Sequence, residues 1–213
     1  MNKRYFKIHR EGWKFFFVSI FLCFIAFFIN LVLFIFFMFV SLFMIWFFRD
    51  PGRNTSSNKS QIISAADGKI CFIGESYPPK ETNISNKFLK VSIFMNVFNV
   101  HINRSPISGT IENIYYKKGK FFNASLDKAS EYNERNSIII SDNKNEIIVV
   151  QIAGLIARRI LSFVREKDNL KKGERLGLIR FGSRVDIYLP LKYKIKVSLK
   201  DKVRAGETVI ADI

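Results

Sequence analysis

The chain has 213 residues, a formal net charge of +16, and hydrophobic residues make up 48% of it. This length suits one compact domain with an accessory segment and is too short for several domains. Cys23 lies in an apolar run and Cys71 beyond it, so no disulfide framework is expected. With only His9 and His101 as histidines, we expect no metal site.

The first predicted element is an apolar segment, residues 13–48, whose only formal charge is Lys14. Its 36 residues far exceed the ~20 needed to cross a bilayer. A cleaved signal peptide would have about 7–15 apolar residues before a small-residue cleavage site. Because this run is longer and ends in the bulky residues 46–48, we expect it to be retained as a membrane anchor.

Length and charge predict a hairpin of two helices within this segment. One helix would measure about 54 Å against a hydrocarbon core of about 30 Å. Asn30, the most polar residue of the central run, is the expected turn. Basic residues flank both ends, which places both ends on the cytoplasmic side. A spanning hairpin and a shallow one that dips into the bilayer fit equally well.

The basic balance suggests either a nucleic acid or an anionic membrane as partner. An anchored basic face gains about 1 kcal/mol per cation near anionic lipid, which favours the membrane. A solvated surface without a partner explains the charge equally well. Nucleic acid is not expected, because the aromatic residues are not interleaved with the basic ones as a stacking platform requires.

Residues 49–61 form a polar linker, and residues 62–213 are dominated by β-branched, period-two runs. We expect a mainly β domain, a small closed β-structure of short strands, with the hydrophobic helical hairpin at the N-terminus. A short helix is expected at 156–165 and a loop at 123–133. The predicted strands are 62–64, 69–73, 89–95, 110–117, 137–141, 147–153, 184–189, 193–199 and 208–213.

Four short units place a glycine where a strand turns, as a positive φ would require: Gly68, Gly109, Gly173 and Gly206. The repeated Gly-Glu turns would also fit a lipoyl- or biotinyl-type carrier module. Such a module needs an exposed lysine at a hairpin tip, and no tip clearly offers one. A membrane-tethered carrier or scaffold that never cleaves is therefore kept as the alternative to an enzyme.

Three residues can carry chemistry, although each also has an ordinary structural explanation. His101 lies between apolar neighbours, Asp67 occupies a turn, and Ser183 precedes a strand. A serine hydroxyl becomes a nucleophile when a histidine oriented by a carboxylate takes its proton. An aspartate, a histidine and a serine in one chain therefore indicate a nucleophilic serine more strongly than any one of them alone.

Five ordered sequence blocks resemble the phosphatidylserine decarboxylase family in its short, membrane-anchored bacterial form. The resemblance covers the chain from Phe47 to the C-terminus. The blocks are Phe48-Arg49-Asp50-Pro51, Ala66-Asp67-Gly68, Asn99-Val100-His101-Ile102-Asn103-Arg104-Ser105-Pro106, Asn133-Glu134-Arg135-Asn136 and Gly173-Glu174-Arg175-Leu176-Gly177-Leu178-Ile179-Arg180-Phe181-Gly182-Ser183-Arg184-Val185-Asp186.

The resemblance implies self-cleavage between Gly182 and Ser183, with His101 as the base and Asp67 as its orienting acid. The products would be a β chain of residues 1–182 and an α chain of residues 183–213, which form a heterodimer. The α chain would begin with a pyruvoyl group derived from Ser183, the cofactor. Glycine before the serine suits a strained turn.

The same resemblance implies a Schiff base between the pyruvoyl group and phosphatidylserine, loss of CO2, and phosphatidylethanolamine as product. The protein would be a pyruvoyl-dependent carboxy-lyase of the bacterial inner membrane, with its catalytic domain on the cytoplasmic side. Arg104 and Arg184 are candidate phosphate or carboxylate partners by bidentate geometry. A surface role for either arginine is at least as well supported.

Two positions depart from the longer family members. Those members have a further histidine where this chain has Phe98, so a protonation role for that histidine does not carry over. They read Gly-Ser-Thr where this chain has Gly182-Ser183-Arg184. Acyl chains are not addressed by the sequence, so the same chemistry on another serine-headed lipid stays open.

Overall fold

The structure is a computed structural model that describes residues 7–120, 132–142, 145–154, 159–180 and 183–213. By internal contacts the chain divides into two compact units, Met1–Gly52 and Arg53–Ile213. Each unit is described by itself. The predicted boundaries of anchor, linker and catalytic domain, at 1–48, 49–61 and 62–213, remain predictions.

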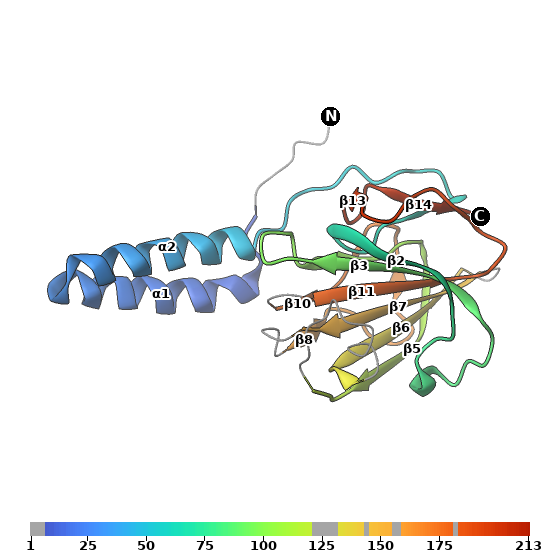
Figure 1. The fold of residues 1–213 in the computed structure, drawn as a ribbon, viewed down its shortest axis with the longest axis horizontal. Coiled ribbons are helices and arrows are strands. Elements are labelled where there is room, and N and C mark those ends of the chain that lie inside the picture. Colours follow the sequence, from blue (N-terminus) through green and yellow to red (C-terminus); the bar gives the residue numbers. More distant parts are fainter. Residues whose placement is uncertain (1–6, 121–131, 143–144, 155–158, 181–182) are drawn as a thin grey trace. The chain divides into compact units, whose positions relative to one another are not determined.

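The first unit is an apolar helical hairpin, as predicted. Helices α1 (Arg10–Ile29) and α2 (Leu31–Phe47) lie side by side and are joined at Asn30 (Figure 1). Asn30 has an extended backbone, and its Oδ1 accepts hydrogen bonds from the N–H groups of Val32 and Leu33 at 2.7 and 3.4 Å. This side-chain cap satisfies N–H groups that open a helix, so one residue suffices for the turn.

The hairpin exposes most of its large apolar side chains, although Phe47 at the end of α2 is fully buried. Phe28 and Val32 are 72% and 73% exposed, and many neighbouring aromatic and aliphatic side chains are similarly uncovered. Helix α1 is long and apolar enough to cross a membrane, whereas α2 has 17 residues. The buried positions of α1 are Gly12, Ser19, Cys23 and Ala26.

The second unit is built almost entirely of strands. They are β1 (Gln61–Ile63), β2 (Gly68–Ser76), β3 (Phe88–Met95), β4 (Ile102–Arg104), β5 (Gly109–Lys117), β6 (Arg135–Ser141), β7 (Glu146–Ala153), β8 (Ile160–Ser162), β9 (Asn169–Leu170), β10 (Arg175–Ile179), β11 (Ser183–Leu189), β12 (Lys194–Ile195), β13 (Lys202–Val203) and β14 (Val209–Asp212). A short 3-10 helix, η1 (Lys80–Thr82), precedes β3.

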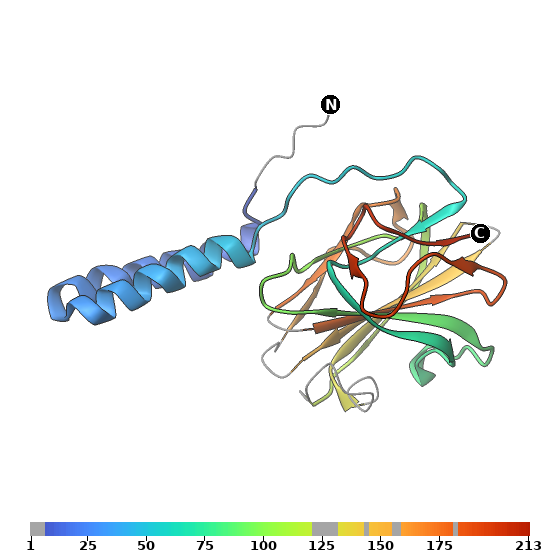
Figure 2. The same ribbon diagram turned by 45° about the horizontal axis from the view of Figure 1, so that its top comes forward.

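The main sheet has eight strands in the order β13-β2-β3-β11-β7-β6-β5-β9, paired antiparallel throughout. It is strongly curled (Figure 2). Two three-stranded sheets, β1-β14-β12 and β4-β10-β8, complete the unit. Side chains alternate between the faces of a strand. The inner face contributes to the main core with Ile93, Val149 and Val185, and the outer face carries a smaller cluster that includes Val150 and Tyr188.

The mainly β prediction is confirmed, and each of the nine predicted strands overlaps an observed one. The helix expected at 156–165 is wrong, because Ile160–Ser162 forms β8 and pairs with β10. Tertiary pairing overrides the local helical pattern there. Most of the expected loop at 123–133 lies outside the described residues.

The four glycines singled out in the sequence serve two different purposes. Gly173 and Gly206 have φ of +80° and +78°, as expected for left-handed turns. Gly68 and Gly109 do not have positive φ, so the prediction is wrong for them. These two glycines instead allow another backbone segment to lie very close. A Cβ at Gly68 would lie 2.2 Å from the Phe94 carbonyl oxygen, and a Cβ at Gly109 would lie 2.3 Å from the Ser141 carbonyl oxygen.

Candidate active site

Ser183 is the first residue of β11, a strand in the interior of the eight-stranded sheet. It is paired with Met95 of β3 on one side and with Ala153 of β7 on the other. Its side chain is fully buried, and among the described residues its Oγ has no hydrogen-bond partner. An unsatisfied buried hydroxyl costs stability and calls for an explanation in function. Gly182, the other residue of the predicted cleavage site, lies outside the described residues.

A chain of buried amide side chains lies beside Ser183. Asn103 of β4 donates from Nδ2 to the Met95 sulfur at 3.6 Å and accepts at Oδ1 from Gln151 Nε2 at 2.8 Å. Gln151 Oε1 in turn accepts from Asn136 Nδ2 at 3.0 Å. All three amides are at most 1% exposed. These hydrogen bonds favour one arrangement of the three amides, although Asn136 Oδ1 has no hydrogen-bond partner among the described residues.

The other strand neighbour of Ser183 is held by a similar contact. Asn133 Nδ2 donates to the Ala153 carbonyl oxygen at 2.7 Å, and Asn133 is 1% exposed. The residues on both sides of Ser183 therefore contact a buried asparagine. Such contacts stiffen the backbone from which the serine hydroxyl projects.

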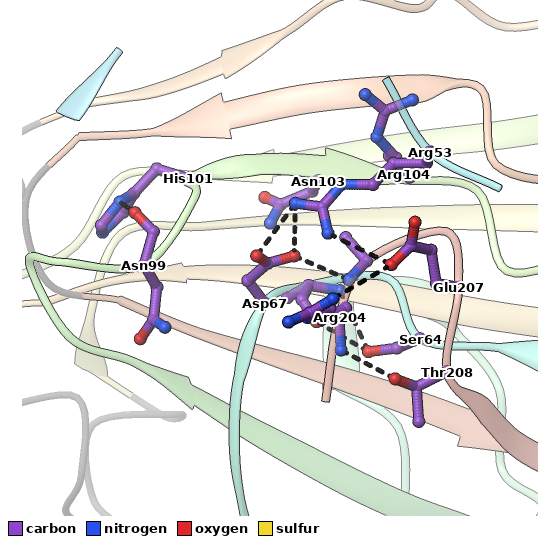
Figure 3. A network of polar contacts seen from close by, with 12 residues as sticks. Arg53, Ser64, Asp67, Asn99, His101, Asn103, Arg104, Arg204, Glu207 and Thr208 are labelled. Carbon is purple, nitrogen blue, oxygen red and sulfur yellow. Dashed lines mark hydrogen bonds and ion pairs between the residues drawn. The ribbon is translucent and has the colours of Figure 1, made fainter. Parts of the chain in front are cut away.

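His101 immediately precedes β4 and is fully buried. Its Nδ1 lies 3.0 Å from the carbonyl oxygen of Asn99 (Figure 3). A carbonyl oxygen only accepts, so Nδ1 is the donor in this contact, and when the ring is neutral its lone pair lies on Nε2. That tautomer is the one a general base requires.

The backbone also brings His101 into the neighbourhood of Ser183. The Ile179 N–H donates to the His101 carbonyl oxygen at 3.4 Å. Ile179 precedes Ser183 by four residues, so their Cα atoms lie within roughly 14 Å of each other even along a fully extended chain. The strand pairing of β4 with β10 thus brings together two motifs that are about 80 positions apart in the sequence.

Asp67 was expected to orient His101, but its observed contacts are with Arg53 and the backbone of Ala205. Its carboxylate pairs with Arg53 Nη2 at 2.9 Å and accepts from the Ala205 N–H at 2.7 Å. Among the described contacts, no hydrogen bond joins Asp67 to His101, and Figure 3 shows His101 beside Asn99 and away from Asp67. The Asn99 carbonyl, not a carboxylate, is the observed partner of Nδ1.

The architecture accounts for this separation. His101 lies at one end of β4, whereas Arg104 at the other end donates its N–H to the carbonyl oxygen of Ala65, two residues before Asp67. His101 and Arg104 are three strand residues apart, roughly 10 Å, and the Asp67 segment is bonded at the Arg104 end. Asp67 belongs to a charged cluster with Arg53 and Glu207, whose side chains are 3.9 Å apart.

Arg184, one of the two predicted substrate-binding arginines, forms a buried ion pair with Asp186. The Arg184 Nε and Nη2 atoms lie 2.8 and 3.0 Å from the two carboxylate oxygens, and the side chains are 2% and 1% exposed. Burial alone would lower the pKa of Arg184, but the Asp186 carboxylate raises it above its usual value. This guanidinium therefore stays charged and is held by Asp186 through one hydrogen bond, from Nη2, and a close ion-pair contact at Nε.

Arg104, the second predicted arginine, is 7% exposed and also turned into the protein. Its Nη1 donates to the Gly173 carbonyl oxygen at 3.0 Å. It thereby joins β4 to the turn that precedes β10. The structure thus places His101 just before β4, which pairs with β10, and Ser183 four residues after the end of β10. Asp67, Arg104 and Arg184 each have a partner elsewhere.

Sequence reasoning missed several residues of this site. Gln151 had a usable signal, since it is the one amide in the otherwise apolar run 147–153. Asn103, Asn133 and Asn136 lay within the family blocks but were given no role. Arg53 had no signal, because nothing in a polar linker indicates a buried partner for Asp67. Within the described part of the chain, no group of three His, Cys, Asp or Glu residues is arranged to hold a metal ion.

Fold and site define a β-rich domain with a fully buried serine at the start of an interior strand, carried on the same chain as an apolar helical hairpin. The family model described as phosphatidylserine decarboxylase matches residues 40–211. Two curated relatives named phosphatidylserine decarboxylase proenzyme, from Xanthobacter autotrophicus and Azorhizobium caulinodans, are each 47% identical over the whole chain and are covered to 92% and 91%. The chain belongs to the phosphatidylserine decarboxylase family, and it is a decarboxylase.

Proposed function

We propose that the chain cleaves itself between Gly182 and Ser183 and then decarboxylates phosphatidylserine to phosphatidylethanolamine. The observation that best supports this proposal is the fully buried Ser183 hydroxyl, which has no hydrogen-bond partner in the described part of the chain. Family membership supplies the reaction class, and the names of the two relatives supply the substrate.

In the first reaction, the Ser183 hydroxyl attacks the carbonyl carbon of Gly182. His101 Nε2 accepts the hydroxyl proton, because the bond from Nδ1 to Asn99 leaves the lone pair on that nitrogen. The amide nitrogen of residue 183 leaves the carbonyl carbon, and an ester replaces the peptide bond. Elimination breaks this ester, and hydrolysis with release of ammonia leaves a pyruvoyl group on residue 183.

The surroundings of residue 183 fit such a group. A pyruvoyl group supplies a ketone that condenses with the substrate amine and accepts the electron pair left by the departing carboxylate. The protein contributes position, since Met95 and Ala153 hold residue 183 in register from both sides. The buried amides beside Met95 keep the site polar without placing a charge there. His101 is the candidate for proton transfer in this second reaction as well.

The sheet supports a heterodimer as the mature form. Residues 183–189 are hydrogen-bonded to β3 along one side and to β7 along the other. The end of the α chain also supplies β14, which pairs with β1 of the β chain. Cleavage before Ser183 cuts one peptide bond and none of these ladders, so the two chains stay associated.

The helical hairpin supports a membrane as the working environment. Its large apolar side chains are exposed, and α1 has the length and composition of a membrane span. We propose a bacterial inner-membrane location with the β-unit on the cytoplasmic side. Exposed cations then face anionic lipid, which contributes about 1 kcal/mol for each cation near the surface.

Intact mass spectrometry of the purified full-length protein tests the proposal. We expect a C-terminal fragment of about 3.5 kDa, which begins at residue 183 and resists Edman degradation because its terminus is a pyruvoyl group. Ser183→Ala should remain one chain and release no CO2 from phosphatidylserine. A wild-type protein that stays intact in detergent, or a Ser183→Ala variant with normal turnover, would refute the proposal.

A further inference from the structure

A cavity lies on the outer face of the eight-stranded sheet, away from Ser183. It has a volume of about 600 Å³, and Asp186 and Tyr188 of β11 contribute to its lining. Side chains alternate along a strand, so these two residues lie on the opposite face from Ser183, whose neighbour Val185 is in the inner core. The thickness of the sheet therefore separates this cavity from the Ser183 side chain.

The floor of the cavity is apolar and its edges are basic. Val150, Ile152 and Tyr188 belong to the outer hydrophobic cluster and line the cavity together with Phe72. Four basic residues line it as well: Lys80, Lys90, Lys117 and Arg135. Asp186 is the one acidic residue in this lining.

The charged residues around the cavity leave a local excess of positive charge, although Glu81 attracts Lys117 as well as Arg135. Asp186 is bound by Arg184, and Arg135 is bound by Glu81. No described residue forms an ion pair with any of the three lysines. The cavity thus combines a lined volume typical of a small-molecule site with a local excess of positive charge.

Strand pairing places two of these lysines on the outer face of the sheet. Lys90 is directly opposite Tyr188 in the register of β3 with β11, and its Nζ lies 4.3 Å from the centre of the Phe72 ring. Lys117 is directly opposite Arg135 in the register of β5 with β6. Two of the lysines therefore belong to the sheet itself. Lys80 belongs to η1 and follows Pro78 and Pro79, which also line the cavity.

The ligand class follows from this arrangement. Several lysine ammonium groups around one space suit a multiply charged oxyanion such as a phosphate. The apolar floor suits the first carbons of an attached chain. Burial raises the pKa of Tyr188 above its usual value, so its hydroxyl stays protonated beside the anion. We propose that this cavity is a second phosphate-binding site, which holds the phosphate group of an anionic amphiphile.

Calorimetric titration of the full-length Ser183→Ala protein in a non-ionic detergent tests the proposal independently of cleavage and turnover. The probes are dihexanoylphosphatidylglycerol, inorganic phosphate and the zwitterionic dihexanoylphosphatidylcholine. We expect saturable binding of the anionic lipid. Competition by inorganic phosphate at similar concentration would assign the site to free phosphate, and weak competition would assign it to the lipid headgroup.

Matched triple variants separate the cavity from general surface charge. Changing Lys80, Lys90 and Lys117 to glutamine should weaken binding about tenfold or more. The control changes three exposed lysines outside the cavity, Lys171, Lys194 and Lys202, to glutamine and removes the same total charge. Binding of that control should change less than about twofold.

Three results would overturn the proposal. They are the absence of saturable binding by both anionic probes, equal losses in the two triple variants, and equal binding of the anionic and zwitterionic lipids. Thermal melting of each variant confirms that a loss of binding does not come from unfolding. The outer face and the serine face can be assayed separately, because the titrations use a chain that cannot cleave.

Discussion

Ser183 and Arg184 are consecutive in the chain, and their side chains lie on opposite faces of the same sheet. Ser183 is buried on the inner side, whereas Arg184 makes its buried ion pair with Asp186 on the outer side. A substitution at Arg184 therefore alters the packing on the outer face of the sheet and not the inner side, onto which the Ser183 side chain projects. This arrangement leads to the first prediction.

Asp186→Asn should destabilise the protein by about 3–5 kcal/mol, because it leaves the Arg184 guanidinium buried without its carboxylate. The double change Arg184→Met with Asp186→Leu should recover most of this stability, since an apolar pair of similar volume removes both charges. Chemical denaturation measures the free energy of unfolding. A double variant that is stable and cleaved but has a sharply raised KM would instead place Arg184 in substrate binding.

The pair formed by Asp67 and Arg53 allows the role of Asp67 to be tested. Asp67→Asn should both destabilise the protein and slow self-cleavage, because the Arg53 side chain is only 6% exposed. Adding Arg53→Met should restore the melting temperature. Cleavage that returns along with stability would make Asp67 structural, whereas cleavage that stays slow would support its role as the acid that assists His101.

His101→Gln should slow self-cleavage by about 10²-fold or more, since a positioned general base contributes roughly 10²–10⁴-fold. Glutamine keeps a polar side chain of similar reach in this buried position. The time course of chain separation after cell-free synthesis measures the rate. His9→Gln is the matched control, because His9 lies in the helical unit, where its Nδ1 caps α1. Unchanged processing in His101→Gln would exclude it as the base.

Stability should depend on pH through Glu81. Burial alone would raise its pKa, but the hydrogen bonds and charge of Arg135 lower it below the ordinary 4.5. The folded pKa is therefore below the unfolded one. The stabilisation is fully present above pH 4.5 and is lost as the pH falls through the folded value.

Melting temperature against pH checks this prediction. Glu81→Gln should melt lower than the wild type at pH 7, and the two curves should converge in acid. Glu75→Gln is the control, since the Glu75 pair with Lys87 is half exposed at 3.6 Å and should contribute little. Parallel curves for Glu81→Gln and the wild type would show that this carboxylate does not carry the acid sensitivity.

Local patterns were sufficient for much of the fold. The apolar run with Asn30 at its centre predicted the hairpin, because a polar residue in that setting caps a helix where the chain reverses. Alternating β-branched runs predicted strands such as 89–95 and 147–153. The pattern failed at 156–165, where pairing with β10 decides the conformation of Ile160–Ser162.

The sequence by itself determined the residue types, the family and the candidate serine, since these follow from the order of side chains along the chain. Only the tertiary structure decided the partners of those side chains. The pairing of β4 with β10 joins the His101 segment to the strand that precedes Ser183, whereas Asp67 pairs with Arg53 from the polar linker. Alternation along β11 then directs Ser183 inward and Arg184 outward, because successive side chains of a strand point to opposite faces of a sheet.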